Sequence, residues 1–345
     1  MIISRTPLRV SFAGGGSDLR AFYEHHTGAV LSTAIDKYIY ITVNRKFDDS
    51  IRASYSRTEI VRSVDEVQHE LIRESLKQVR ISGGIEVTSI SDIPSEGTGL
   101  GSSSTYTVGL LNALHAHTGR SAGAERLARE ACDIEIVRCA KPIGKQDQYI
   151  AAYGGLQFIQ FNADESVFVD PVVCSAEAKR TLHERLLMFY TGLTRSADSI
   201  LEEQRQNIQS DDQRRGTLRN MTSLAHELRD CLVNEDLDSF GDALHQGWLL
   251  KTRLASGITT GTIDEWYARA RAQGAIGGKI LGAGGGGFLL LYAPRERHED
   301  IKRALAELRS ISFNLEPQGS KIIYVEEGGY AHGPRDVGAQ PEAHR

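Results

Sequence analysis

Apolar residues recur along the chain with two different spacings, which separate the expected strands from the expected helices. Residues 39–43 and 156–161 are rich in β-branched and aromatic side chains, which is typical of strands. Residues 102–117 and 214–232 repeat apolar side chains every three or four positions, as amphipathic helices do. A further helix is expected at 122–139. Helices and strands therefore alternate along the whole chain, which indicates an α/β or α+β fold.

The second half of the chain contains a glycine-rich segment between two apolar runs. Residues 277–292 have the pattern of a strand, a glycine loop and a second strand. A short helix at 304–308 and a strand at 322–325 are expected to follow. The glycines of the loop satisfy G-x-G-x-x-G, as in dinucleotide-binding proteins. In those proteins the motif opens a helix, whereas an apolar strand is expected here, so we set that alternative aside.

The length of the chain favours two domains. Its 345 residues are about twice the size of a typical single domain. Polar, helix-rich sequence begins near residue 175. We therefore expect an N-terminal domain at 1–178 and a C-terminal domain at 179–327. The polar residues 328–345, rich in Gly and Pro, are expected to form a mobile tail.

Charge, hydropathy and cysteine content limit the kinds of binding partner and the cellular compartment that we expect. Lys plus Arg number 40 against 45 Asp plus Glu, a net charge of −5, which argues against a nucleic acid partner. The apolar run at 288–293 is far shorter than the roughly 20 residues of a membrane span, and the first residues lack the apolar core of a signal peptide. No C-x-x-C pair occurs, which favours free thiols in a reducing compartment. We expect a cytoplasmic protein with a small-molecule partner. The sequence gives no signal for the oligomeric state.

Residues 94–105, Pro-Ser-Glu-Gly-Thr-Gly-Leu-Gly-Ser-Ser-Ser-Thr, carry the most informative chemistry. They follow a strand expected to begin at residue 85 and lead into the helix expected at 102–117. Their three glycines allow backbone N–H groups to converge, and the helix N-terminus adds its positive end, so the segment can cradle phosphates. The serine hydroxyls can contact phosphate oxygens or Mg²⁺. The alternative is a flexible loop in which a serine caps the helix.

Three segments, in this order, resemble the signature of the GHMP kinases, the family of galactokinase and mevalonate kinase. Residues 7–18 are similar to the sugar-binding opening motif, residues 94–105 to the phosphate-binding motif and residues 279–288 to the third, glycine-rich motif. The resemblance implies a two-domain α+β fold. Its N-terminal domain would be a mixed α/β domain of the ribosomal protein S5 domain 2-like type, and its C-terminal domain would be ferredoxin-like. It also implies ATP and Mg²⁺ as cofactors.

The resemblance implies roles for individual residues. Asp147 would orient the acceptor hydroxyl and accept its proton, and Arg9 would help to hold the aspartate and the transferred phosphoryl group. Ser103 and Glu135 would bind magnesium, although either flanking serine could replace Ser103. The nucleotide would contact Gly97, Gly99, Leu100, Gly101, Ser102, Ser103 and Ser104. The acceptor would contact Gly15, Gly16, Ser17, Asp18, Gly284, Gly285 and Arg195.

Spacing alone also allows a purely structural role for each of the three carboxylates. Glu135 lies on or at the edge of an apolar helix face, where it needs a partner, either a metal ion or Arg138. Asp147 precedes an expected helix and could be its N-cap. Asp18 could simply occupy a turn.

Within the family, residues 12–18, 144–148 and 190–197 look most like the D-glycero-α-D-manno-heptose 7-phosphate kinases, and fucose kinases share much of the pattern. This resemblance implies phosphorylation of the anomeric C1 hydroxyl, giving the 1,7-bisphosphate for nucleotide-activated heptose synthesis. Arg195 would then be a candidate to meet the phosphate of the acceptor. The alternatives are a kinase for another sugar, such as L-fucose, and a non-catalytic sugar-sensing relative.

Overall fold

The first of two sheets is built around two long antiparallel strands, β1 (Ile2–Ala13) and β2 (Gly28–Arg45). The computed structural model describes residues 1–94, 97–194 and 197–326, and within them eight strands form this sheet. Its main path runs β12-β1-β2-β5-β3-β4, while β6 and β7 extend from the other half of β2. The remaining strands are β3 (Ile51–Ser54), β4 (Thr58–Val61), β5 (Ile85–Ser91), β6 (Leu156–Phe161), β7 (Val167–Pro171) and β12 (Lys321–Val325).

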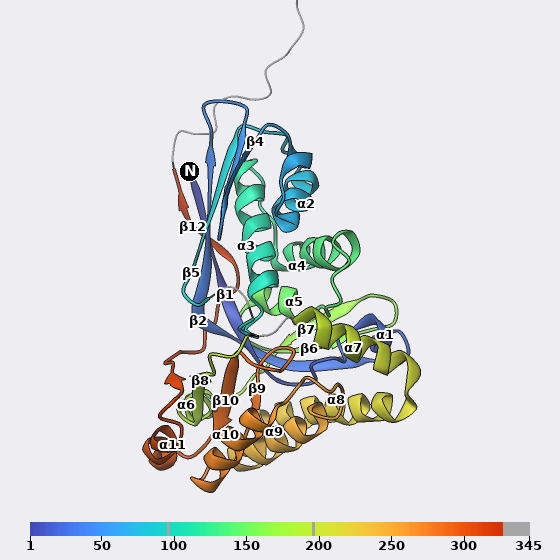
Figure 1. Cartoon of the computed structure of the whole chain (residues 1–345), viewed down its shortest axis with the longest axis vertical. Coiled ribbons are helices and arrows are strands. Elements are labelled where there is room, and N and C mark those ends of the chain that lie inside the picture. The colour runs from blue at the N-terminus through green and yellow to red at the C-terminus, as the bar shows by residue number, and fades with distance from the viewer. Residues whose placement is uncertain (95–96, 195–196, 327–345) are drawn as a thin grey trace, which may run out of the picture.

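Helices cover one face of this sheet, and Figure 1 shows α3 running alongside the strands with α2 and α4 beyond it. They are α2 (Glu70–Val79), α3 (Ser102–His117), α4 (Ala124–Cys132) and α5 (Gln146–Tyr153). Most of α3 is buried, because it lies between the sheet and the other helices. The prediction of a helix at 102–117 is confirmed. The helix expected at 122–139 is divided, because α4 ends at Cys132 and a π-helical turn (Asp133–Arg138) follows.

The second sheet is antiparallel and has the order β11-β8-β10-β9 in the described chain. Its strands are β8 (Leu186–Tyr190), β9 (Gly277–Ile280), β10 (Phe288–Tyr292) and β11 (Arg309–Ser310). The prediction of a strand, a glycine loop and a strand at 277–292 is confirmed. The helices of this part are α6 (Ala176–Glu184), α7 (Ala197–Ser210), α8 (Asp212–Val233), α9 (Leu237–Lys251), α10 (Gly261–Ala272) and α11 (His298–Ala304), and the short α1 (Arg20–Tyr23) contacts α7.

The helix expected at 304–308 is wrong, because α11 ends at Ala304. Leu305 and Leu308 are buried in tight turns that lead into β11, with the Leu308 N–H donating to the carbonyl of Leu305 at 2.9 Å. The spacing of these two leucines therefore arises because both are buried within turns, and it does not mark one face of a helix.

Two sheets with separate helical layers form the predicted two-domain α+β architecture. The chain crosses between the two parts more than once. Strand β12 returns to the first sheet beside β1, and α8 packs against β1 and β2. The boundaries 1–178 and 179–327 stay a prediction, and the expected tail at 328–345 lies outside the described residues.

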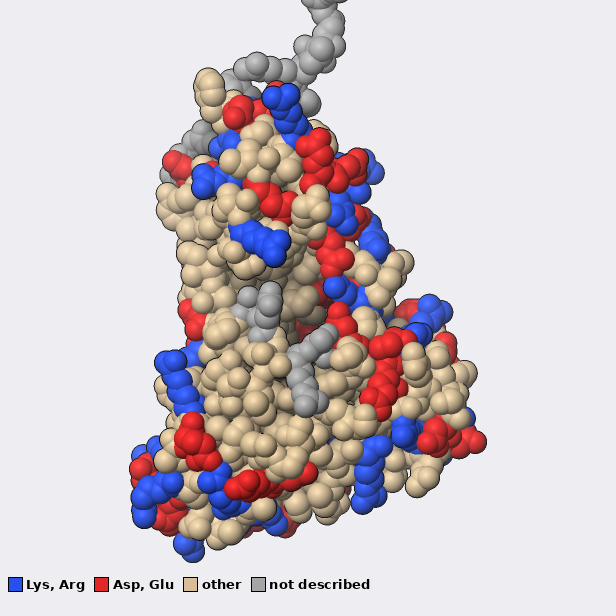
Figure 2. Space-filling model, in the orientation of Figure 1, with Lys and Arg blue, Asp and Glu red and all other residues tan. Residues whose placement is uncertain are grey.

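The surface carries acidic and basic side chains mixed over the face seen in Figure 2, without a continuous basic stripe on that face. No helix within the described ranges combines the length and the apolar character needed to cross a membrane.

Candidate active site

A cavity of about 820 Å³ lies between the two sheets, with walls from β1, the segments 97–104 and 141–147, α7, α9 and the third glycine motif. It brings together segments that are more than 250 residues apart in the sequence. Most of the predicted site residues line it: Arg9, Gly15, Gly16, Asp18, Gly97, Gly99, Gly101, Ser102, Ser103, Ser104, Asp147 and Gly284. The three sequence motifs thus meet at one place.

The segment at 97–101 has the backbone expected of an anion cradle. Gly97, Gly99 and Gly101 have φ angles of 68°, 75° and 78°, in the left-handed region that favours glycine. A Cβ on Gly99 would lie 2.3 Å from the carbonyl oxygen of Leu281, so no side chain fits there. The N-cap of α3 is Gly101 and not a serine, and it provides no side-chain cap. The N–H groups of the first turn are therefore left for an anion, as at many phosphate sites.

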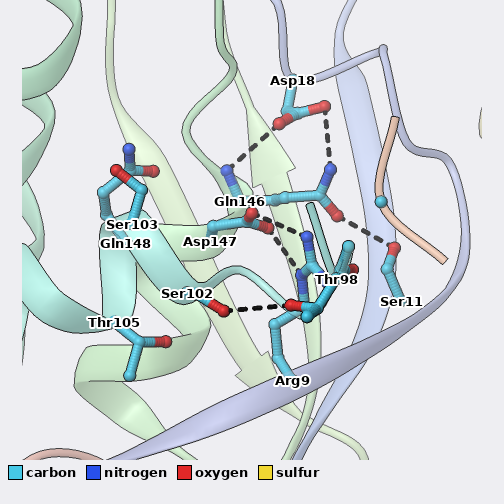
Figure 3. A network of polar contacts seen from close by, with 12 residues as sticks. Arg9, Ser11, Asp18, Thr98, Ser102, Ser103, Thr105, Gln146, Asp147 and Gln148 are labelled. Carbon is cyan, nitrogen blue, oxygen red and sulfur yellow. Dashed lines mark hydrogen bonds and ion pairs between the residues drawn. The ribbon is translucent and has the colours of Figure 1, made fainter. Parts of the chain in front are cut away.

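Arg9 and Asp147, which we call the arginine–aspartate pair, face each other in the cavity (Figure 3). The Nε and Nη2 atoms of Arg9 donate to the two carboxylate oxygens of Asp147, each at 2.6 Å. Nη1 of Arg9 donates to the carbonyl of Gly99 at 2.6 Å, which joins the pair to the glycine segment. The N-cap of α5 is Lys145, so Asp147 is not the helix cap. Two parallel bonds to a planar guanidinium fix the carboxylate in one orientation.

Glu135 is fully buried behind Ser103, in the π-helical turn after α4. Ser103 Oγ donates to one carboxylate oxygen at 2.7 Å, and Gln148 Nε2 donates to the other at 2.6 Å. Burial raises the pKa of Glu135, and these hydrogen bonds only partly oppose the increase. The alternative partner, Arg138, pairs instead with Asp133 at 2.8 Å.

The donor set around Glu135 fits a magnesium ion. Magnesium prefers oxygen ligands and is usually held by one or two carboxylates together with phosphate oxygens and water. Ser103 donates to Glu135 at 2.7 Å, whereas Ser102 pairs with Thr98 at 3.2 Å. Ser103 is thus in direct contact with the carboxylate, and which serine of residues 102–104 binds the metal ion stays a prediction. A cation here would favour the ionised carboxylate, which burial alone disfavours.

Asp18 is held against the start of α5 by Gln146, which sequence reasoning did not single out. The backbone N–H and the side-chain amide of Gln146 donate to Asp18 at 3.2 and 3.3 Å, and Ser11 Oγ donates to the Gln146 oxygen at 2.9 Å (Figure 3). Asp18 also accepts from the backbone N–H of Gly16 at 2.9 Å, so it closes a turn as well. Burial, and next the charge of Asp147, raise the pKa of Asp18. This array offers carboxylate and amide groups to hydroxyls of a ligand.

Two predicted contacts lie behind the cavity wall. The Ser17 hydroxyl is fully buried, donates to the carbonyl of Ala29 at 3.0 Å and accepts from the N–H of Ala29 at 3.1 Å. The Leu100 side chain is also fully buried, and its carbonyl accepts from the backbone N–H of Arg9 at 3.1 Å. Both residues shape their loops and neither lines the cavity, so their predicted contacts with substrate and nucleotide stay predictions.

The third motif lines the cavity mainly with residues other than those predicted, among them Lys279, Gly282 and Gly286. Gly284 lines the cavity, but Gly285 does not, because its N–H donates to the carbonyl of Ile258 at 2.8 Å behind the loop. Gly282 packs directly on the phosphate segment, since a Cβ there would lie 2.4 Å from the Cα of Gly99. Arg195 lies outside the described residues.

Sequence reasoning missed two lysines of the cavity. Lys251 ends α9 and Lys279 lies in β9, and both are more than nine-tenths buried. A charged residue inside an otherwise apolar strand was a usable signal for Lys279, because lysine is rarely buried without a specific contact. Lys251 gave no such signal, because a basic residue is common in the last turn of a helix.

The comparisons with known proteins agree with this geometry. The GHMP kinases N terminal domain matches residues 60–155, and the GHMP kinases C terminal domain matches residues 228–310. The chain therefore belongs to the GHMP kinase family and is a phosphotransferase that acts on a sugar, with ATP as the phosphoryl donor of that family.

The most similar relatives include heptose and fucose kinases. The D-glycero-alpha-D-manno-heptose 7-phosphate kinase of Campylobacter jejuni is 27% identical over 337 residues, covering 91% of this chain and 97% of that protein. The bifunctional fucokinase/GDP-fucose pyrophosphorylase of Arabidopsis thaliana is 26% identical over 87% of this chain, which spans only 31% of that protein. The crystal structure of a D-glycero-D-manno-heptose 1-phosphate kinase from Bacteroides thetaiotaomicron has a TM-score of 0.77, 23% identity, and coverage of 94% of this chain and 100% of that one.

Proposed function

We propose that this protein transfers the γ-phosphoryl group of ATP to the anomeric C1 hydroxyl of D-glycero-α-D-manno-heptose 7-phosphate, giving the 1,7-bisphosphate. The relative that matches over nearly its whole length carries the name of this activity, which supports the choice of acceptor. The product would serve the synthesis of nucleotide-activated heptose.

The observation that carries the proposal is the position of Asp147 beside the phosphate segment. A Cβ on Gly101 would lie 3.2 Å from Asp147 Oδ2, so the carboxylate stands directly beside the backbone that is suited to phosphates. A general base must be within hydrogen-bonding reach of the proton that it accepts, while the transferred group must be held in line. This juxtaposition supplies both conditions within one cavity.

In the proposed reaction the phosphates of ATP lie against the N–H groups of residues 97–101 and of the first turn of α3. The C1 oxygen forms a bond to the γ-phosphorus while its proton passes to Asp147. The bond between that phosphorus and the bridging oxygen breaks, and ADP leaves. Arg9 holds the carboxylate in place through its two bonds. Magnesium, held by Glu135 and by Ser103 or Ser104, would neutralise charge on the phosphates.

The acceptor would bind on the side of the cavity formed by Asp18 and Gln146. Their carboxylate and amide can accept from and donate to neighbouring hydroxyls of a sugar, which fixes the orientation of the ring. The bond from Ser11 to Gln146 keeps this amide in position.

An ADP-release assay with a panel of acceptors tests the proposal. The panel contains heptose 7-phosphate, the unphosphorylated heptose, L-fucose, galactose and mevalonate, each with ATP and Mg²⁺. We expect heptose 7-phosphate to have the highest kcat/KM, with phosphorus NMR showing a new phosphate ester at C1. Equal or faster turnover of L-fucose would contradict the choice of acceptor and favour the fucose kinase. ADP release with none of these sugars, combined with retained ATP binding, would favour the non-catalytic relative.

A further inference from the structure

Two buried ammonium groups form part of the cavity wall, and the proposed reaction does not use them. Lys251 Nζ, from the C-terminal end of α9, donates to the carbonyls of Ile280, at 3.3 Å, and Gly282. Lys279 Nζ, from β9, donates to the carbonyl of Phe12 at 3.1 Å. Both side chains line the cavity, and only about one-twentieth of each residue is exposed.

Neither lysine has an ion-pair partner among residues 1–94, 97–194 and 197–326. The carboxylate that acts on the pKa of Lys251 is Asp147, which is already bound through both oxygens to Arg9. Burial, and next the charge of Arg9, lower the pKa of Lys251 to about 7. Burial together with the charges of Lys251 and Arg9 holds the pKa of Lys279 well below its usual value. Burial and the cationic neighbours thus disfavour the charged forms of both lysines, and an anion bound beside them would favour those forms.

Each ammonium also retains donors for a ligand. An ammonium has three N–H donors, and the bonds to carbonyls account for two on Lys251 and one on Lys279. We propose that Lys251 and Lys279 form a phosphate subsite that binds the phosphate group carried by the acceptor. This inference rests on the proposed function, in which the acceptor is a sugar phosphate.

The position of Lys279 favours the acceptor over the nucleotide. Figure 3 shows Ser11 on one side of the arginine–aspartate pair and Ser103 on the other. Lys279 binds the carbonyl of Phe12, the residue after Ser11, and so lies on the side of the acceptor array. Lys251 donates to the carbonyl of Gly282, which packs on Gly99, and so lies between this side and the phosphate segment. The nucleotide phosphates already have the glycine amides and the helix N-terminus, so the pair of cations is better matched to a second phosphate.

The primary test is the ratio of kcat/KM for heptose 7-phosphate to kcat/KM for the unphosphorylated heptose. Lys251→Met and Lys279→Met remove the charge and keep a similar volume, so the cavity wall stays filled. We expect each variant to lower the ratio by about tenfold or more, the usual loss for a hydrogen bond to a charged group. The KM for ATP should stay within about threefold of the wild-type value. Lys302→Met is the matched control, because Lys302 is half-exposed on α11, does not line the cavity and pairs with Glu299 of the same helix.

A ratio that stays unchanged in both variants overturns the inference. A loss of ATP affinity as large as the loss for the acceptor also overturns it, because the lysines would then serve the nucleotide.

Inorganic phosphate provides a second measurement that does not depend on turnover. With a saturating non-hydrolysable ATP analogue in place, titration calorimetry should detect phosphate binding to the wild type, weakened about tenfold or more in either lysine variant. Equal phosphate binding by wild type and variants contradicts the subsite. The wild type could turn over only unphosphorylated sugars while the lysine variants still lose phosphate binding. The proposed acceptor would then be wrong, but the anion subsite would be supported. Thermal unfolding of each variant shows whether the fold is intact.

Discussion

The two sides proposed for the cavity, one for the nucleotide and one for the acceptor, are built from different parts of the chain. On the nucleotide side, the phosphate segment uses backbone N–H groups, and Glu135 is buried among neutral hydrogen-bond donors. On the acceptor side, the groups are charged and polar side chains, including Asp18, Gln146 and Lys279. The first side comes largely from one continuous segment and the helix after it, whereas the second is assembled from β1, α5, α9 and β9.

This difference indicates that the acceptor specificity of the cavity can change more readily than its binding of the nucleotide. Backbone amides recognise any triphosphate and tolerate few substitutions, because the close approach of Gly99 to Leu281 leaves no space for a Cβ. Side chains on separate elements can be exchanged one at a time, so acceptor choice can change while nucleotide binding is retained. Substitutions on each side, and a change of pH, can test whether the two sides separate in this way.

The largest effect is expected for Asp147→Asn, which should lower kcat roughly 10²–10⁴-fold, the usual contribution of a positioned base. The amide keeps the volume but cannot accept the proton of the acceptor. ATP affinity should stay within about threefold, because the proposed contacts with its phosphates are backbone N–H groups of residues 97–101 and of the first turn of α3. Asp65→Asn, at an exposed position, is the matched control. Steady-state kinetics together with calorimetry of ATP binding measure both quantities, and retention of kcat within a few-fold would show that Asp147 is not the base.

The second prediction concerns the nucleotide side. Glu135→Gln should weaken Mn²⁺ or Mg²⁺ binding in the presence of an ATP analogue by roughly 10–100-fold or more, since loss of even an outer-sphere partner costs that much. Electron paramagnetic resonance of bound Mn²⁺ measures this without turnover. The affinity for the acceptor should be unchanged, with the exposed Glu299→Gln as control. If metal affinity is normal and acceptor binding is lost, the two sides are not separable.

The smallest effect is a pH dependence confined to the acceptor side. The pKa of Lys251 is lowered to about 7, and the charged groups that act on it are Arg9, Asp147 and Lys279. The ammonium binds phosphate only when protonated, so preference for a phosphorylated acceptor should fall as pH rises through 7. Between pH 7 and 8 the protonated fraction drops roughly fivefold. The kcat/KM ratio measured from pH 6.5 to 8.5 should follow this fall in the wild type and fall less steeply in Lys251→Met, which keeps only the titration of Lys279. A parallel fall in the variant would assign the pH dependence to another group.

The two sides also differ in how far their functional residues could be predicted from the sequence. The chemistry of residues 97–101 depends on glycines that are adjacent in the sequence, so their function could be predicted from a short segment. The helix at 102–117 was predicted to the residue, because apolar spacing, preceding glycines and the glycine after it agree. The positions of Arg9, Asp18 and Asp147 could be proposed only through family resemblance, since nothing local brings them together.

Other features depend on tertiary contacts that no local pattern encodes. The π-helical turn closes with the N–H of Cys139 donating to the carbonyl of Ile134, five residues earlier, at 2.9 Å. Apolar periodicity predicts a continuous α-helix there, because such a turn has no signature of its own. Lys251 and Gln146 likewise become site residues only when α9 and the start of α5 are placed beside β1.

Strand β12 has a consequence for how the protein is made. Strand β1 leaves the ribosome well before its outer neighbour, β12, which is synthesised more than 300 residues later. During translation one edge of β1 is therefore an open template for other strands, and chaperone binding or misassembly at that edge competes with completion of the sheet. Any nascent or truncated chain that lacks residues 321–325 carries the same exposed edge.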